Sequence, residues 1–351
     1  MLPYWILFAV FAFGAIRNSR HGTEEQKPTI VFRLALIGLV LMIGLRFEVG
    51  GDWGHYLGFF RRMSIFDFDR AITMGDPSYA AINWLVRRAD FSMGIVNLLC
   101  ATIFVIGLGT FARRQPNPWL AILVAVPYLI IVVAMGYTRQ AAAMGFVMWG
   151  LAAFDRGQMQ KFGATILGAV TFHLTAIVAL PMGVMAVTRN RMVTYAMLLL
   201  LGASLYVIFV RGDVDRLFTV YVDAKYASQG ALTRVAMNIP AATFFLLARR
   251  RFGMSPESTK LWTNMSIAAF ACLAMLAFTS ASTAVDRLAL YLIPLQIVVL
   301  SRIPAYFAKS NAEKLGLTAL IVALSAVIQF VWLNYAQHVE YWLPYNNYLW
   351  A

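Results

Sequence analysis

Long apolar runs, separated by short polar segments, follow one another along almost the whole chain. A helix that crosses a bilayer needs about 20 apolar residues. The runs are continuous and do not alternate with polar positions, which favours helices over transmembrane β-strands. We therefore expect an all-α polytopic membrane protein. The runs cover residues 2–16, 30–46, 91–111, 119–136, 139–154, 162–187, 192–210, 234–248, 261–279, 286–301 and 315–333.

The run 162–187 is too long for one straight span and carries His173 in its middle. It is either one tilted helix or two short helices that meet near His173. The positive-inside rule favours the two-helix hairpin, because only then do Arg189, Arg191 and the cluster 249–251 lie on the cytoplasmic side. The sequence thus predicts about twelve transmembrane segments, one pair being a short hairpin, with both termini extracytoplasmic.

Composition supports this interpretation. The chain is 61% hydrophobic and 13% charged, whereas an ordinary soluble domain is about 45–50% apolar and about 25% charged. These values exclude a soluble enzyme and a disordered chain. The net charge of +13 reflects cytoplasmic anchoring residues, so we expect no nucleic-acid partner. The chain is predicted to form a single integral domain, residues 1–351.

Two long loops are predicted on the extracytoplasmic side, at residues 47–90 and 211–233. The first has aromatic residues such as Tyr56 at helical spacing, followed by Asp76 and Pro77. Asp76 is predicted to be an N-cap, with Pro77 at the first helical position. We expect two interfacial helices in this loop and a functional site at the outer boundary of the membrane.

Ionisable and hydrogen-bonding side chains gather at the extracytoplasmic ends of the predicted spans. Such residues are costly beside a bilayer and are candidates for function. Guanidinium groups bind phosphate oxygens bidentately, so several arginines here suit a diphosphate. The chain has no Cys/His spacing typical of a metal site, and no Walker or dinucleotide motif. The predicted substrate-binding residues are Arg46, Arg139, Gln140, Arg234, Arg287, Tyr56 and Tyr291.

Three residues are candidates for a catalytic base, and the sequence does not choose among them. His173 lies within an apolar run, and a neutral imidazole is suited to deprotonating a sugar hydroxyl. Asp52 follows two glycines that let the backbone approach a substrate closely. Asp286 is the third candidate, although an ion pair with the adjacent Arg287 is its simplest structural explanation.

The order of these motifs resembles that of the EpsG family of Wzy-type bacterial polysaccharide polymerases. The resemblance covers roughly residues 40–300, and its specificity lies in the order and spacing of short motifs. This sequence has Asp76-Pro77 where the family often has Glu-Pro, and Trp53 where a Tyr is common. The matching residues are Arg46, Gly51, Asp52 and Tyr56; Asp76, Pro77, Tyr79 and Asn83; Arg139, Gln140 and Ala143; His173 and Ala176; and Asp286, Arg287, Tyr291 and Pro294.

The resemblance implies a GT-C-like glycosyltransferase fold in the bacterial cytoplasmic membrane. It implies an inverting transfer at the outer face, from undecaprenyl diphosphate to a lipid-linked repeat unit, without a metal or another cofactor. The arginines would then stabilise charge that a metal stabilises in other enzymes. The expected partners are the lipid-linked oligosaccharide, membrane lipid, and flippase and chain-length or export proteins.

Three alternatives fit parts of the pattern. A transporter or flippase of lipid-linked glycans would need polar residues near the midplane, where the sequence has almost none. A membrane O-acyltransferase would also use an intramembrane histidine, but its polar groups would open to the cytoplasm. An interaction protein of an export complex would not require the arginine cluster.

Overall fold

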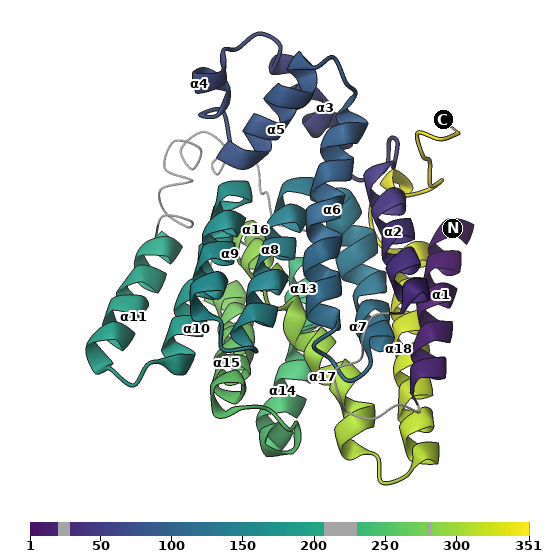
Figure 1. Cartoon of the computed structure of the whole chain (residues 1–351), viewed down its shortest axis with the longest axis vertical. Coiled ribbons are helices and arrows are strands. Elements are labelled where there is room, and N and C mark those ends of the chain that lie inside the picture. The colour runs from purple at the N-terminus through teal and green to yellow at the C-terminus, as the bar shows by residue number, and fades with distance from the viewer. Residues whose placement is uncertain (20–28, 207–229, 279–281, 351) are drawn as a thin grey trace.

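The structure, a computed structural model, describes residues 1–19, 29–206, 230–278 and 282–350 (Figure 1). Within these ranges it is helical and contains no strand beyond one isolated bridge, between Arg46 and Asn347. The predicted loop 211–233 falls largely outside the described residues. The first eleven elements are α1 (Leu2–Asn18), α2 (Ile30–Gly44), α3 (Trp53–Arg62), α4 (Phe68–Ala71), α5 (Pro77–Arg88), α6 (Met93–Ala112), α7 (Pro118–Ala125), the π-helix η1 (Val126–Ala134), α8 (Thr138–Phe154), α9 (Met159–Phe172) and the 3₁₀-helix η2 (Leu174–Val178).

The second half of the chain continues in the same way, and helices account for the predicted apolar runs. The loop 47–90 contains α3 and α5, where two helices are predicted, and the short α4 between them. The remaining elements are α10 (Ala179–Val187), α11 (Arg191–Tyr206), α13 (Ala231–Ala236), α14 (Ile239–Ala248), η4 (Arg249–Arg251), α15 (Pro256–Phe278), α16 (Ser282–Leu290), α17 (Ile293–Phe307), α18 (Asn311–Tyr335) and η5 (Val339–Tyr341).

Four helical stretches in the described ranges are long and apolar enough to cross a membrane. They are Met93–Ala112, Ala231–Arg251, Pro256–Phe278 and Asn311–Tyr335. The pair α16 and α17, bent by 41°, makes up to five. The other apolar helices are shorter, so length and composition confirm a polytopic helical protein while the predicted number of twelve segments stays a prediction.

Helix α8 lies at the centre of the molecule and packs closely against α6 (Figure 1). Glycines make this approach possible. A Cβ atom at Gly107 would lie 1.8 Å from the carbonyl oxygen of Gly145, and one at Gly145 would lie 2.6 Å from the Cα atom of Phe104. Small residues allow helix backbones to pack closely where hydrophobic burial provides no driving force. The contact fixes α8, whose first residues carry the candidate site.

The predicted break at His173 is present. His173 has extended backbone (φ −162°, ψ 116°) and ends α9, after which η2 and α10 lead the chain back. The first end of the hairpin is the start of α9, which follows Asp155. At the other end, beyond α10, the carbonyl of Thr188 accepts a hydrogen bond from Lys260 on α15. Ser258 on the same helix donates to Asp155. Both ends of the hairpin therefore lie at one end of the molecule, and His173 lies toward the other.

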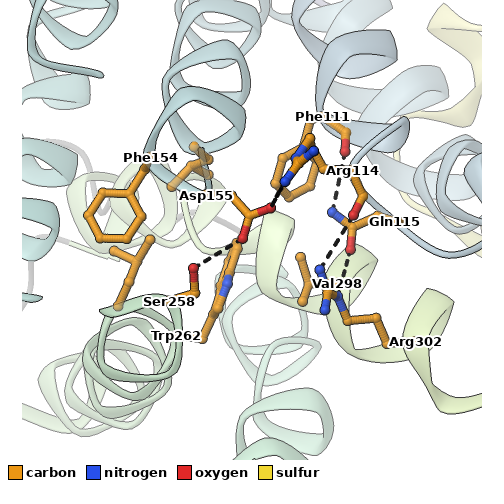
Figure 2. A pocket seen from close by; sticks show the side chains of 11 residues that line it. Phe111, Arg114, Gln115, Phe154, Asp155, Ser258, Trp262, Val298 and Arg302 are labelled. Atoms are coloured by element: carbon orange, nitrogen blue, oxygen red, sulfur yellow. Dashed lines mark hydrogen bonds and ion pairs between the residues drawn. The ribbon is translucent and has the colours of Figure 1, made fainter. Parts of the chain in front are cut away.

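A polar network joins the helices at the end opposite His173 (Figure 2). The buried guanidinium of Arg302 on α17 donates to Gln115 Oε1 (2.9 Å) and to the carbonyls of Phe252 (3.3 Å) and Arg114 (3.4 Å). The Arg114 side chain forms an ion pair with Asp155 at 2.9 Å. Hydrogen bonds to carbonyls satisfy the Arg302 donors, so the network connects α17 with the segments that follow α6, α8 and η4.

We predict that Arg302→Leu destabilises the protein, because Gln115 Oε1 and two carbonyls lose a donor in a buried place. The expected loss is about 1–3 kcal/mol, measured as a lowered thermal unfolding temperature in detergent. Arg250→Leu, which removes an exposed arginine at the same end, is the control and should change little. Equal effects of the two substitutions would contradict a structural role of the network.

Candidate active site

Three segments that are distant in sequence bring charged residues together at the end of the molecule that carries α3 and α5. Arg139 is in the first turn of α8, and its Nη1 donates to Asp76 Oδ2 at 2.9 Å. His173 Nδ1 lies 3.8 Å from the same carboxylate oxygen. The side chains are partly exposed, 39% for Arg139, 14% for Asp76 and 15% for His173. They form a partly solvated charged group that a ligand can reach.

Asp76 is the site residue that the sequence analysis did not identify. It occupies the predicted N-cap position of α5, with Pro77 at the helix start, but its side chain makes no capping hydrogen bond. The carboxylate instead binds Arg139, 63 residues away. The predicted position of Asp76 as the N-cap of α5 is confirmed. Its carboxylate makes no capping hydrogen bond because a charge-assisted partner, Arg139, lies on another helix.

Two tyrosines surround the Arg139 guanidinium. Its Cζ lies 6.0 Å from the ring centre of Tyr56 and 5.9 Å from that of Tyr79, within cation–π range. Burial raises the pKa of Tyr56 to about 12, while the nearby Arg139 acts in the opposite direction. The Tyr56 phenol therefore stays protonated at neutral pH and supplies a hydrogen-bond donor or acceptor beside the arginine.

The imidazole of His173 lies beside Asp76. Its Nδ1 faces Asp76, and its Nε2 is buried without a hydrogen-bond partner among the described residues. The neighbouring hydroxyls bind elsewhere, since Ser78 donates to Thr171 at 2.8 Å. A histidine with one nitrogen at a carboxylate and the other free has the arrangement of a general base.

A second ion pair lies on α13 and α16. Arg234 Nε and Nη2 donate to the two oxygens of Asp286, at 2.8 and 2.6 Å. The expected structural partner of Asp286 was the adjacent Arg287, whereas the observed bidentate partner is 52 residues away. The hydroxyl of Tyr128 on η1 is buried near this pair and has no hydrogen-bond partner among the described residues.

Arg287 and Gln140 connect the two ion pairs. Gln140 on α8 donates to the backbone carbonyl of Arg287 at 2.9 Å, which fixes the start of α8 to α16. Arg287 is exposed, and its charge acts to lower the pKa of Asp52. The backbone of Arg287 is held by Gln140, and its exposed guanidinium can bind an incoming anion.

Asp52 lies in the tight loop before α3. It is at the N-cap position, yet its side chain makes no capping bond. Burial raises the pKa of Asp52, while Arg287, His55 and Arg139 lower it. Gly50 has φ +108°, and a Cβ there would lie 2.3 Å from the carbonyl of Met135, so the loop needs glycine to fit against the η1 end.

Arg46 and Tyr291 are the most deeply buried of the predicted site residues. Arg46 is 1% exposed, and its guanidinium donates to the carbonyls of Ile43 (2.6 Å) and Val49 (3.3 Å) and to Thr138 Oγ1 (2.7 Å). It positions the residue that precedes Arg139. Tyr291 is 2% exposed, and its hydroxyl accepts from Thr175 at 3.5 Å. Substrate binding by either residue stays a prediction.

The structure thus brings together the predicted residues Asp52, Tyr56, Arg139, His173 and Arg287, and Gln140 links them to the Arg234–Asp286 pair. The described ranges contain no cluster of three His, Cys, Asp or Glu side chains that could hold a metal ion. What the arrangement offers chemically is fixed positive charge beside a histidine–carboxylate pair. Such a site can hold an anionic leaving group and accept a proton.

Comparison with known proteins agrees with the resemblance of the motifs. A sequence model described as the EpsG family matches residues 29–347, which include all of the predicted site residues. No curated protein and no solved structure matches the chain. Because the match covers most of the 351 residues, the chain belongs to the EpsG family.

Proposed function

We propose that this protein is an inverting polysaccharide polymerase that uses no metal. In the proposed reaction a glycan leaves undecaprenyl diphosphate and joins a lipid-linked repeat unit of an exopolysaccharide or capsule. Membership of the EpsG family is consistent with a polysaccharide polymerase-like membrane protein and supports this proposal. The observation that carries it is the meeting of Arg139, the Asp76–His173 pair and Arg287 at one end of the molecule.

Diphosphate binding is assigned to the arginines. Arg139 uses Nη1 for Asp76 and is 39% exposed, so further N–H donors of its guanidinium are accessible to a ligand. Arg287 is exposed near Asp52. As the glycosidic bond breaks, negative charge develops on the diphosphate, and fixed guanidinium groups stabilise that charge without reorganising.

His173 is proposed as the general base, with Asp76 as the carboxylate that orients it. The acceptor hydroxyl loses its proton to the imidazole of His173, and its oxygen attacks the anomeric carbon of the donor sugar. The bond from that carbon to the diphosphate oxygen breaks on the opposite side, and its electrons leave with the diphosphate. The configuration at the anomeric carbon is therefore inverted.

The proposed orientation places the site on the outer side of the bacterial cytoplasmic membrane. The loops at the opposite end carry Arg113, Arg114, Arg156, Arg189 and the cluster Arg249–Arg251, which suits a cytoplasmic face. This arrangement corresponds to twelve segments with the hairpin at His173. Lipid-linked oligosaccharide is then the substrate, and flippase and chain-length or export proteins are the proposed partners.

The first prediction about the reaction concerns Arg139. Arg139→Gln should reduce kcat/KM by about 100-fold, the usual cost of losing one donor to transition-state charge. The measurement is polymer formation by the purified protein, reconstituted with its lipid-linked repeat unit and without nucleotide sugar or metal. Arg62→Gln removes an exposed arginine from α3 and should leave the rate unchanged.

Arg46→Gln is compared with Arg139→Gln for its effect on protein stability. It removes a buried guanidinium with three protein acceptors, so its main effect should be a lowered unfolding temperature. Arg139→Gln should lower the unfolding temperature less, because Arg139 is 39% exposed and the glutamine amide can still donate to Asp76. Normal polymer formation by Arg139→Gln would refute its proposed role.

The second prediction distinguishes His173 from Asp52. His173→Gln should lower the rate by about 10²–10⁴-fold, the usual contribution of a general base, and Asp52→Asn should retain most of the rate at neutral pH. The measurement is the pH dependence of kcat/KM in the same assay for both variants.

If Asp52 is the general base, a different pH profile is expected. Were Asp52 the base, the rate would rise with pH through a value above about 3.9, the ordinary aspartate pKa, because burial raises the pKa of Asp52. Asp52→Asn would then abolish both this acid limb and the rate. That result would transfer the role of base from His173 to Asp52.

A further inference from the structure

An apolar cavity of about 290 Å³ lies beside the candidate active site, among α8, α10, α11, α15 and α16. Its volume is near the lower end of the roughly 300–1,000 Å³ that is typical of small-molecule sites. Aliphatic and sulfur-containing side chains form most of its wall. Representative lining residues are Val147, Met182, Met185, Ala268, Met275 and Leu288.

The two polar side chains in the wall that bear hydrogen-bonding groups have partners within the protein. Asn264 Nδ2 donates to the carbonyl of Met182 at 3.2 Å, and the Tyr291 hydroxyl accepts from Thr175 at 3.5 Å. An ordered water needs two to four polar partners, which this wall does not offer. The cavity is therefore suited to hydrocarbon.

The cavity is long and has a lateral opening. Its lining residues run along α15 from Leu261 to Met275, and at 1.5 Å per residue this stretch is about 21 Å long. That is about two-thirds of the 30 Å hydrocarbon thickness of a bilayer. Ile267, which lines the cavity, is 57% exposed, and Ala271 in the next turn is also exposed. A hydrocarbon chain can therefore enter the cavity from the side of the helix bundle.

Two residues of the cavity wall are close in the chain, or hydrogen-bonded, to residues next to the charged site. Leu288 and Tyr291 line the cavity, and Leu288 directly follows Arg287 in α16. Tyr291 binds Thr175, two residues beyond His173. A ligand whose anionic group lies at the arginines would therefore have its apolar part beside the cavity mouth.

We propose that this cavity binds the hydrocarbon chain of a prenyl phosphate carrier whose phosphate groups lie at Arg287 and Arg139. The inference rests on the proposed function and adds where its lipid substrate is held. A single apolar cavity whose wall includes Leu288, the residue after Arg287, fits one hydrocarbon chain better than the two chains of a phospholipid. Four methionines in the wall, Met182, Met185, Met265 and Met275, are flexible enough to pack against a methyl-branched chain.

The test measures binding of undecaprenyl phosphate to the full-length protein by native mass spectrometry from phosphatidylglycerol nanodiscs. Ala268→Phe fills the cavity and should weaken binding at least 10-fold. Ala271→Phe narrows the exposed opening, where a larger side chain is tolerated, and should weaken binding as well. Ala274→Phe makes the same change on the same helix at an exposed position outside the cavity lining and should bind like the original protein.

Unchanged binding in both Ala268→Phe and Ala271→Phe, each confirmed as folded by its unfolding temperature, would overturn the inference. Displacement of undecaprenyl phosphate by phosphatidylglycerol in equal proportion would also overturn it, since the cavity would then hold ordinary membrane lipid. Failure of the proposed function gives a different result. In that case the protein binds undecaprenyl phosphate in a cavity-dependent way, but forms no polymer from the lipid-linked repeat unit.

Discussion

The high cost of an unpaired charge in an apolar helix bundle governs how this molecule is organised. Each buried or half-buried arginine described above is matched either by carbonyl and amide oxygens or by a carboxylate. Arg46 and Arg302 donate mainly to oxygens of the main chain and of neutral side chains, and are fully enclosed. Arg139 and Arg234 bind carboxylates and stay partly open. The first pair holds helices together, whereas the second leaves charge at a surface that a substrate can reach.

This distinction separates residues that look alike in the sequence. Arg46 and Arg139 both lie at the ends of apolar runs, and both suit a phosphate by residue type alone. Only their packing differs, since Arg46 is folded back beneath the loop that carries Asp52, and Arg139 points toward Asp76 and the tyrosine rings. Arg46 supports the site through Thr138, the residue immediately before Arg139.

The sequence was sufficient for the features that depend on local pattern. Hydrophobic runs predicted the helices, and the distribution of positive charge between loops favoured a break of the long run 162–187 near His173. The pairing of charges was not predictable, because Asp76–Arg139 and Arg234–Asp286 join residues 63 and 52 positions apart. From local spacing, Asp76 was expected at the N-terminus of a helix, and Asp286 was expected to pair with the adjacent Arg287. Tertiary packing supplied better donors for both carboxylates, and it also enclosed Arg46, which no local signal indicates.

The hairpin at His173 explains why charged and apolar surfaces meet at this place. A straight helix over the same residues would carry His173 through the bilayer interior, where an imidazole needs a protein partner or water. The break instead turns the chain next to Asp76, and the returning residues Val178, Ala179 and Met182 become one wall of the apolar cavity. One interruption of a helix therefore positions the proposed base and also forms the proposed lipid site. A ligand with a charged head and a long apolar tail matches both surfaces at once, whereas a water-soluble sugar nucleotide would leave the apolar wall unused.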